Sequence, residues 1–197
     1  MSDVCYGIDV SNNNSQFDWE RWKNHIQFAM AKATESDDFR DQQFERNWAA
    51  MKHLGIKRFA YHYGEPGVSP VNQAAFFLST VGKHGINKDD NFVLDIETTD
   101  GMSPTDVSFW AWTFCHTVNE RRPGHRMIVY TYPSFADAGN CAQLGRHPLW
   151  VANYAVPAPE VPPPWKQWTF WQYVGTPLGL DKFNGSRAEL DKFCNNG

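Results

Sequence analysis

The sequence predicts an α/β fold in which eight strands close into a TIM-like barrel with an incomplete outer ring of about five helices. Strand and helix patterns alternate five times up to residue 144, which is typical of a parallel sheet. Three more strand patterns follow without full helices between them. The length of 197 residues lies at the small end for such barrels. We therefore expect residues 1–197 to form a single catalytic barrel domain.

The strands are predicted from short apolar runs, rich in β-branched and aromatic residues, between turn signals. They cover residues 4–10, 27–34, 56–63, 92–97, 126–132, 149–154, 168–174 and 180–183. The connector at 156–166 holds five prolines, so it cannot form an ordinary helix. Enzymes of this architecture work at the mouth where the carboxyl ends of the parallel strands meet.

The helices are predicted from apolar residues at helical spacing and from their caps. They cover residues 17–22, 42–53, 69–83, 103–121 and 135–144, with a terminal helix at 187–194. Ser69 followed by Pro70 supplies an N-cap and an N1 proline, and Ser103 begins a capping box with Asp106 in place of Glu. Gly55 and the Pro123-Gly124 pair end the helices before them.

The strand at 92–97 carries the main functional signal. Alternation puts Asp95 and Glu97 on the same face, with Cβ atoms roughly 6 to 7 Å apart. Like charges at that range split each other's pKa values, so one carboxyl can keep its proton near neutral pH. Glycoside hydrolysis uses such a pair, one acid for the leaving oxygen and one for the anomeric centre. A solvated strand end is the alternative for these two residues.

Composition and charge limit the kinds of molecule that the protein is expected to bind. A net charge of -4 without a basic stripe disfavours nucleic acid, and the chain has no apolar run long enough to span a membrane. Nine Trp, seven Tyr and fourteen Phe exceed what the core needs and fit a protein that stacks sugar rings, although core filling accounts for most of them. We expect a monomer that binds a glycan.

The chain offers no sign of a secretory leader, a metal site or a cofactor. If the sequence is complete, residues 1–3 lead directly into a strand and no signal peptide precedes it. Seven histidines form neither H-x-H nor H-E-x-x-H. The four cysteines have no CxxC spacing, so we expect them to be reduced and buried; pairing of Cys115 with Cys141 and of Cys5 with Cys194 is the alternative.

Eight segments, in order, resemble the family 25 glycoside hydrolases, the Chalaropsis-type lysozymes. They are YGIDVS (6–11), AKATE (31–35), AYHY (60–63), LDIE (94–97), YTYPSF (130–135), LWVANY (149–154), WQY (171–173) and FNGS (183–186). The resemblance implies a flattened barrel and a muramidase that cleaves the β-1,4 bond between N-acetylmuramic acid and N-acetylglucosamine in bacterial peptidoglycan. A protein of this kind without a leader fits a phage endolysin that passes from the host cytoplasm to the wall; otherwise it is extracellular.

The resemblance also implies roles for single residues. Glu97 matches the general acid, and Asp95 and Asp9 match the carboxylates that complete the site. The expected substrate-binding residues are Tyr61, Glu35, Tyr130, Trp150, Gln172 and Asp181, and Trp171 matches a further aromatic position of the groove. Core packing for the aromatic residues and a loop-capping role for Glu35 are the alternatives. His62 faces away from Tyr61 and Tyr63 and is expected in the core.

One position departs from the family pattern. The family often has an aspartate four residues before the Phe of its Phe-Asn-Gly, and here that place is Gly179. The nearest acid is Asp181, two residues before Phe183, so its role as a fourth site carboxylate is in doubt.

Two other functions stay open at this point. A chitinase-like N-acetylglucosaminidase also has an acid at the end of a barrel strand, but its longer run of spaced acids is absent here. A non-catalytic peptidoglycan-binding barrel would keep the groove without the chemistry, and the intact Asp9, Asp95 and Glu97 disfavour it.

Overall fold

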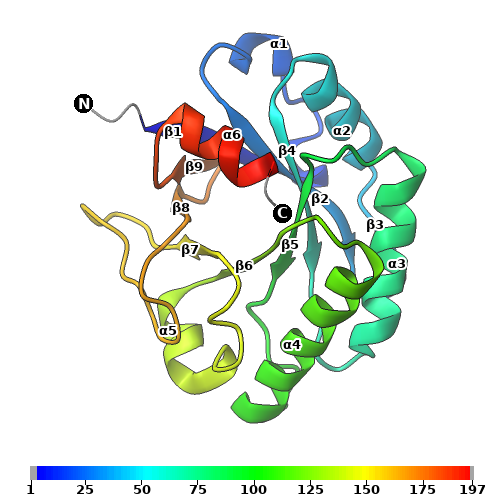
Figure 1. Ribbon diagram of the computed structural model, residues 1–197, viewed down its shortest axis with the longest axis vertical. Coiled ribbons are helices and arrows are strands. Elements are labelled where there is room, and N and C mark those ends of the chain that lie inside the picture. The colour runs from blue at the N-terminus through cyan, green and yellow to red at the C-terminus, as the bar shows by residue number, and fades with distance from the viewer. Residues whose placement is uncertain (1–3, 196–197) are drawn as a thin grey trace.

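A closed barrel forms the centre of the molecule (Figure 1). The computed structural model describes residues 4–195; residues 1–3, on which the expected absence of a leader depends, and residues 196–197 lie outside the described part. The strands are β1 (Cys5–Val10), β2 (Phe28–Glu35), β3 (Phe39–Arg40), β4 (Lys57–Tyr63), β5 (Asn91–Asp95), β6 (Met127–Thr131), β7 (Leu149–Ala152), β8 (Phe170–Val174) and β9 (Gly179–Phe183).

Eight of these strands close the barrel, as predicted. The order runs β1-β9-β8-β7-β6-β5-β4-β2, and β2 pairs with β1 again, with Gly7 opposite Phe28. β3, which the sequence did not predict, adds two residues to the outer edge of β2 and stands outside the ring. A two-residue strand is too short to show a period in the sequence.

The direction of the last strand differs from the parallel sheet that the sequence predicted. β9 runs antiparallel to both of its neighbours, β8 and β1, whereas the other barrel pairs are parallel. The cause is the connection: residues 175–178 join β8 to β9, and four residues can make a hairpin but not a crossover. The beginning of β9, at Gly179, therefore lies at the same mouth as the carboxyl ends of the other strands.

The helices cover only part of the barrel. They are α1 (Trp19–Trp22), α2 (Phe44–His53), α3 (Pro70–Lys83), α4 (Pro104–Arg121), α5 (Pro133–Phe135) and α6 (Arg187–Asn195), with a 3-10 turn η1 (Asn12–Asn14) and a π turn η2 (Ala136–Asn140). Ser69 and Ser103 cap α3 and α4, as predicted, and Asp18 caps α1. The helix expected at 135–144 is shorter, because Gly139 leaves helical geometry at φ 93°.

Side chains divide into an inner and an outer core. The inner core fills the barrel with alternate residues of the strands, among them Phe28, Phe59 and Phe170, and Leu190 of α6 closes one end of it. The outer core lies between the strands and helices α2, α3 and α4, which Figure 1 shows along one side of the barrel. Apolar residues thus occupy the end under α6, and polar inner residues collect at the opposite mouth.

The cysteines are all free and buried, as expected. None of the helices in residues 4–195 has the length and apolar character needed to cross a bilayer.

Candidate active site

A pocket of about 250 Å³ opens at the mouth where the parallel strands end. It brings together seven of the predicted residues: Asp9, Tyr61, Asp95, Glu97, Tyr130, Trp150 and Gln172. A second hollow, of about 480 Å³, continues from Glu97 and Tyr130 past Tyr132 and Tyr154. Together they form a groove long enough for more than one ring of a glycan.

Asp95 and Glu97 line the same pocket, but β5 ends earlier than predicted. Asp95 is the last strand residue, and Ile96 still donates its amide to the carbonyl of Tyr130 at 3.1 Å. Glu97 then leaves the sheet toward the turn at 98–101. Asp95 is buried and Glu97 is partly exposed, so Glu97 is the carboxyl that a ligand in the groove meets first.

The electrostatics of this pair favour a retained proton. Burial, together with the charge of Glu97, raises the pKa of Asp95 well above its ordinary value. Burial also raises the pKa of Glu97, against the opposing charge of Lys32. Oδ1 of Asp95 has no hydrogen-bond partner among the described residues. Two neighbouring carboxyls with raised pKa values can hold one proton at the groove, as an acid catalyst must.

Asp9 reaches the same pocket from β1 and is held by an amide. Gln172 Nε2 donates to Asp9 Oδ2 at 2.6 Å. The Gln172 Oε1 atom accepts from the hydroxyl of Tyr130 at 3.0 Å and also from the hydroxyl of Tyr154. Burial raises the pKa of Asp9 to about 6, and the hydrogen bond from Gln172 works against that rise.

Asp181 lies behind Asp9 and does not line the pocket. Trp150 Nε1 donates to Asp181 Oδ1 at 2.8 Å. Burial and the charge of Asp9 raise the pKa of Asp181 well above its usual range, which favours the protonated form of Asp181 beside Asp9. Oδ2 of Asp181 has no hydrogen-bond partner among the described residues. Asp181 thus supports Asp9 from behind.

Lys32 is a site residue that the sequence reasoning missed. Its Nζ atom binds Glu35 Oε2 at 2.5 Å and lies 5.1 Å from the centre of the Tyr63 ring. Its charge lowers the pKa of both Asp95 and Glu97. The signal was present, because the inner face of β2 carries Phe28 and Met30 and the next alternate residue is Lys32.

Two of the predicted aromatic and acidic residues lie elsewhere. Glu35 is not among the residues that line the pocket, and its carboxylate is held by Lys32. Trp171 packs in the outer core, where its Nε1 donates to the carbonyl of Asn153 at 2.7 Å. Successive strand residues face opposite sides, so Trp171 and its neighbour Gln172 cannot both enter the barrel.

His62 is a core residue, as expected. Its ring atoms bond Thr34 Oγ1 and Gln73 Oε1, each at 2.8 Å, and burial lowers its pKa to about 3. Other residues at the mouth were missed: Ser11, Asn13 and Asn14 after β1, and residues 175–177 before β9. The run of three asparagines after a strand carrying Asp9 was the available signal for the first group.

A closed barrel of mainly parallel strands, with a groove at their carboxyl ends and neighbouring acids whose pKa values burial raises, is the arrangement that a glycoside hydrolase uses. The model of the glycosyl hydrolases family 25 matches residues 8–178. The chain belongs to this family, and it is a glycoside hydrolase, as the eight segments predicted.

Relatives and solved structures agree with this membership. Lysozyme M1 of Streptomyces globisporus is 34% identical over 96% of this chain and 71% of its own length. The N,O-diacetylmuramidase of Arthroderma benhamiae is 28% identical over 97% of this chain and 87% of its own length. The crystal structure of a lysozyme from Streptomyces coelicolor superposes with a TM-score of 0.90 and 32% identity, covering 100% of this chain and 99% of the other. The predicted barrel is confirmed.

Proposed function

We propose that this enzyme is an N-acetylmuramidase, a lysozyme that cleaves the β-1,4 bond between N-acetylmuramic acid and N-acetylglucosamine in bacterial peptidoglycan. Its relatives carry the names lysozyme and muramidase. The observation that carries the residue roles is the meeting of Asp9, Asp95 and Glu97 in one pocket at the barrel mouth. Asp9 comes from β1, whereas Asp95 and Glu97 come from the end of β5 and the residues directly after it, far away in the sequence.

Glu97 acts as the general acid. It is the partly exposed member of the pair, it lines both hollows of the groove, and its pKa is raised by burial. A carboxyl that keeps its proton near neutral pH can deliver it to the glycosidic oxygen as the bond to the anomeric carbon breaks. After the leaving sugar departs, the Glu97 carboxylate can accept a proton from the attacking water.

Asp95 and Asp9 act near the anomeric carbon of the sugar whose glycosidic bond is cleaved. We favour a substrate-assisted route, in which the acetamido oxygen of muramic acid attacks the anomeric carbon while Glu97 protonates the leaving oxygen. Water then opens the resulting ring and restores the acetamide. Asp95, deeper than Glu97, would orient the acetamido group, and Asp9 would stabilise the positive charge that develops on the sugar. Direct attack of water, with inversion, is the alternative route.

The substrate-binding roles follow from the same geometry. Tyr61, Tyr130 and Trp150 line the pocket and present ring edges or faces to a sugar, and Gln172 orients Asp9. Asp181 supports Asp9 and Trp150 without contacting substrate, and Glu35 acts through Lys32. We further propose that residues 1–197 form one catalytic domain, that the protein is monomeric, and that it works at the bacterial wall, as a phage endolysin or as an extracellular enzyme.

Digestion of purified peptidoglycan with analysis of the new reducing ends tests the function. Muramic acid ends are expected; glucosamine ends would point to the chitinase-like alternative, and binding without release of fragments to a non-catalytic barrel. Glu97→Gln should lower the rate by about 100-fold or more, because general acid catalysis typically contributes that much. Glu45→Gln, an exposed glutamate on α2, is the matched control. Undiminished lysis by the Glu97 variant would remove the assignment.

A further inference from the structure

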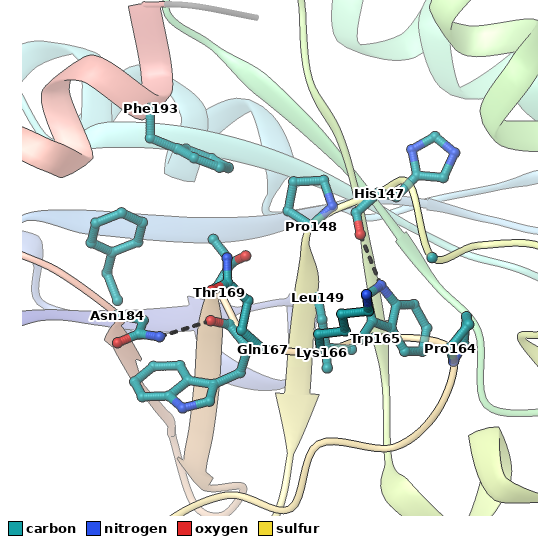
Figure 2. Close-up of a pocket in the computed structure, with 13 residues that line it drawn as sticks. His147, Pro148, Leu149, Pro164, Trp165, Lys166, Gln167, Thr169, Asn184 and Phe193 are labelled. Carbon is teal, nitrogen blue, oxygen red and sulfur yellow. Dashed lines mark hydrogen bonds between the residues drawn. The ribbon is translucent and has the colours of Figure 1, made fainter.

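A hollow separate from the catalytic groove lies at the opposite end of the barrel. It has a volume of about 660 Å³ and is bounded by the beginning of β7 and β8, the end of β9, the connector after Pro164 and helix α6. Figure 2 shows Phe193 reaching down from α6 on one side, with Trp165 and Lys166 of the connector on the other. The barrel core separates this hollow from the catalytic acids.

The wall of the hollow is fixed by hydrogen bonds. Trp165 Nε1 donates to the carbonyl of His147 at 2.8 Å, and Asn184 Nδ2 donates to the carbonyl of Trp168 at 3.0 Å; both bonds are dashed in Figure 2. The amide of Thr169 bonds the carbonyl of Leu149 at 2.8 Å. The connector is therefore held against β7 and β9, and the hollow is preformed rather than assembled when a ligand arrives.

Several polar groups around the hollow have no protein partner. Trp168 is partly exposed, and its Nε1 atom makes no hydrogen bond to a described residue, unlike Nε1 of Trp165. The amide of Gln167 and the ammonium group of Lys166 are exposed and unpaired among the described residues. The hollow thus offers a flat indole with a free donor, a side-chain amide and a cation.

The charge of this end differs from that of the catalytic mouth. Three carboxyls gather at the mouth, whereas no Asp or Glu is among the described residues lining this hollow and Lys166 contributes a positive charge. An indole face with amide groups suits an acetamido sugar, and the lysine suits a carboxylate. A strand of N-acetylated sugars whose alternate residues carry acidic peptides satisfies all three requirements, because its acetamido groups match the indole and the amide and its peptide carboxylates match the lysine.

We propose that this hollow, formed by Trp165, Lys166, Gln167, Trp168, Asn184 and Phe193, is a second, non-catalytic binding site for an anionic acetamido-sugar strand of the bacterial wall. The inference rests on the proposed function, because it takes the ligand to be the polymer that the enzyme cleaves. Since that polymer is an insoluble network, a strand held at one end of the barrel keeps the catalytic groove close to neighbouring strands.

Binding is tested in the Glu97→Gln background, so that the wall is not degraded during the measurement. Co-sedimentation with purified peptidoglycan should show an affinity about 2- to 12-fold lower for Trp168→Ala, the range expected for one aromatic stacking contact. Lys166→Gln should weaken binding of peptidoglycan but leave binding of chitin oligosaccharides, which lack carboxylates, unchanged. Trp112→Ala, a partly buried tryptophan on α4, is the matched control and should bind like the parent.

Activity of the otherwise wild-type enzyme gives the second measurement. Trp168→Ala should hydrolyse a short soluble muramyl oligosaccharide with unchanged kcat/KM but lyse insoluble walls more slowly. If Trp168→Ala does not fold, the exposed pair Lys166→Gln and Gln167→Ala takes its place. Unchanged binding and lysis in these folded variants, or an equal loss on soluble and insoluble substrates, would overturn the second site. Failure of the wild type to release reducing ends would instead overturn the proposed function.

Discussion

The amide of Gln172 donates to Asp9 Oδ2 at 2.6 Å and thereby ties β8 to β1 across the intervening strand β9. The ionised Asp9 carboxylate can only accept, so it selects the amide nitrogen of Gln172, and the amide oxygen then accepts from the hydroxyls of Tyr130 and Tyr154. Asp9 is thus presented to the pocket with one oxygen bound and its orientation fixed. The two tyrosine hydroxyls therefore help to position the Asp9 carboxylate through Gln172.

Removal of this amide should lower activity and change its pH dependence. The hydrogen bond from Gln172 lowers the pKa of Asp9, so Gln172→Ala should raise that pKa above about 6. If ionised Asp9 is needed, the acid limb of the pH–rate profile should move to higher pH. Loss of a hydrogen bond to a charged group, worth about 1.5–3 kcal/mol, predicts a rate about 10- to 150-fold lower at neutral pH. Exposed Gln143→Ala is the control, and an unshifted acid limb would contradict this role.

The charge of Lys32 should determine the pH at which activity falls on the basic side of the pH–rate profile. Its positive charge lowers the pKa of Glu97, so Lys32→Met should raise the pKa of the general acid. The acid works only while protonated, and the basic limb should therefore move to higher pH. Lys32→Arg, which keeps the charge, should restore the original limb. A basic limb that stays in place in the Met variant would show that Lys32 serves only to hold Glu35.

The sequence predicted the barrel because strand and helix patterns alternate, because capped helices separate the first strands, and because the strand patterns number eight. It could not give the direction of β9 from the apolar pattern, which is the same for a parallel and an antiparallel strand. The four-residue connection before Gly179 was the usable clue. Asp9, Asp95 and Glu97 were predictable because each follows an apolar run. Tyr154 was not, because its role depends on a contact with Gln172 of β8. Lys32 was overlooked although it follows Phe28 and Met30 on the inner face of β2.

Ionised Asp9 should lower the free energy of unfolding of the enzyme at neutral pH. The folded state raises its pKa from 3.8 to about 6, so the folded protein binds a proton more tightly than the unfolded chain. The stability gained from that proton is complete below pH 4 and is lost as the pH rises through 6. The side chain of the Asp9→Asn variant cannot ionise. The gain in unfolding free energy that this substitution gives should therefore be greater at pH 7 than at pH 4, by at most about 3 kcal/mol.

Thermal unfolding of the wild type and Asp9→Asn at pH 4 and pH 7 measures this effect. The variant should be inactive, while its Tm gain should be present at pH 7 and absent at pH 4. Asp38→Asn, at an exposed position outside the helices, controls for the loss of one negative charge. A Tm difference that is the same at both pH values would mean that the ionisation of Asp9 is not what costs stability.

Gly179 leaves no room for a side chain beside Asp9. It pairs with Asp9 across β9 and β1, and a Cβ atom at residue 179 would lie 1.6 Å from Asp9 Oδ2. Gly179→Ala should therefore displace the Asp9 carboxylate from Gln172 and lower activity by about 100-fold, as a misplacement near 1 Å can do. Overpacking should also cost about 1–3 kcal/mol of stability. Gly82→Ala, at an exposed position of α3, is the control. Because the collision is with one side chain, the stability cost should disappear in an Asp9→Ala background; a cost that persists there would mean that the backbone of β9, and not the carboxylate, requires glycine.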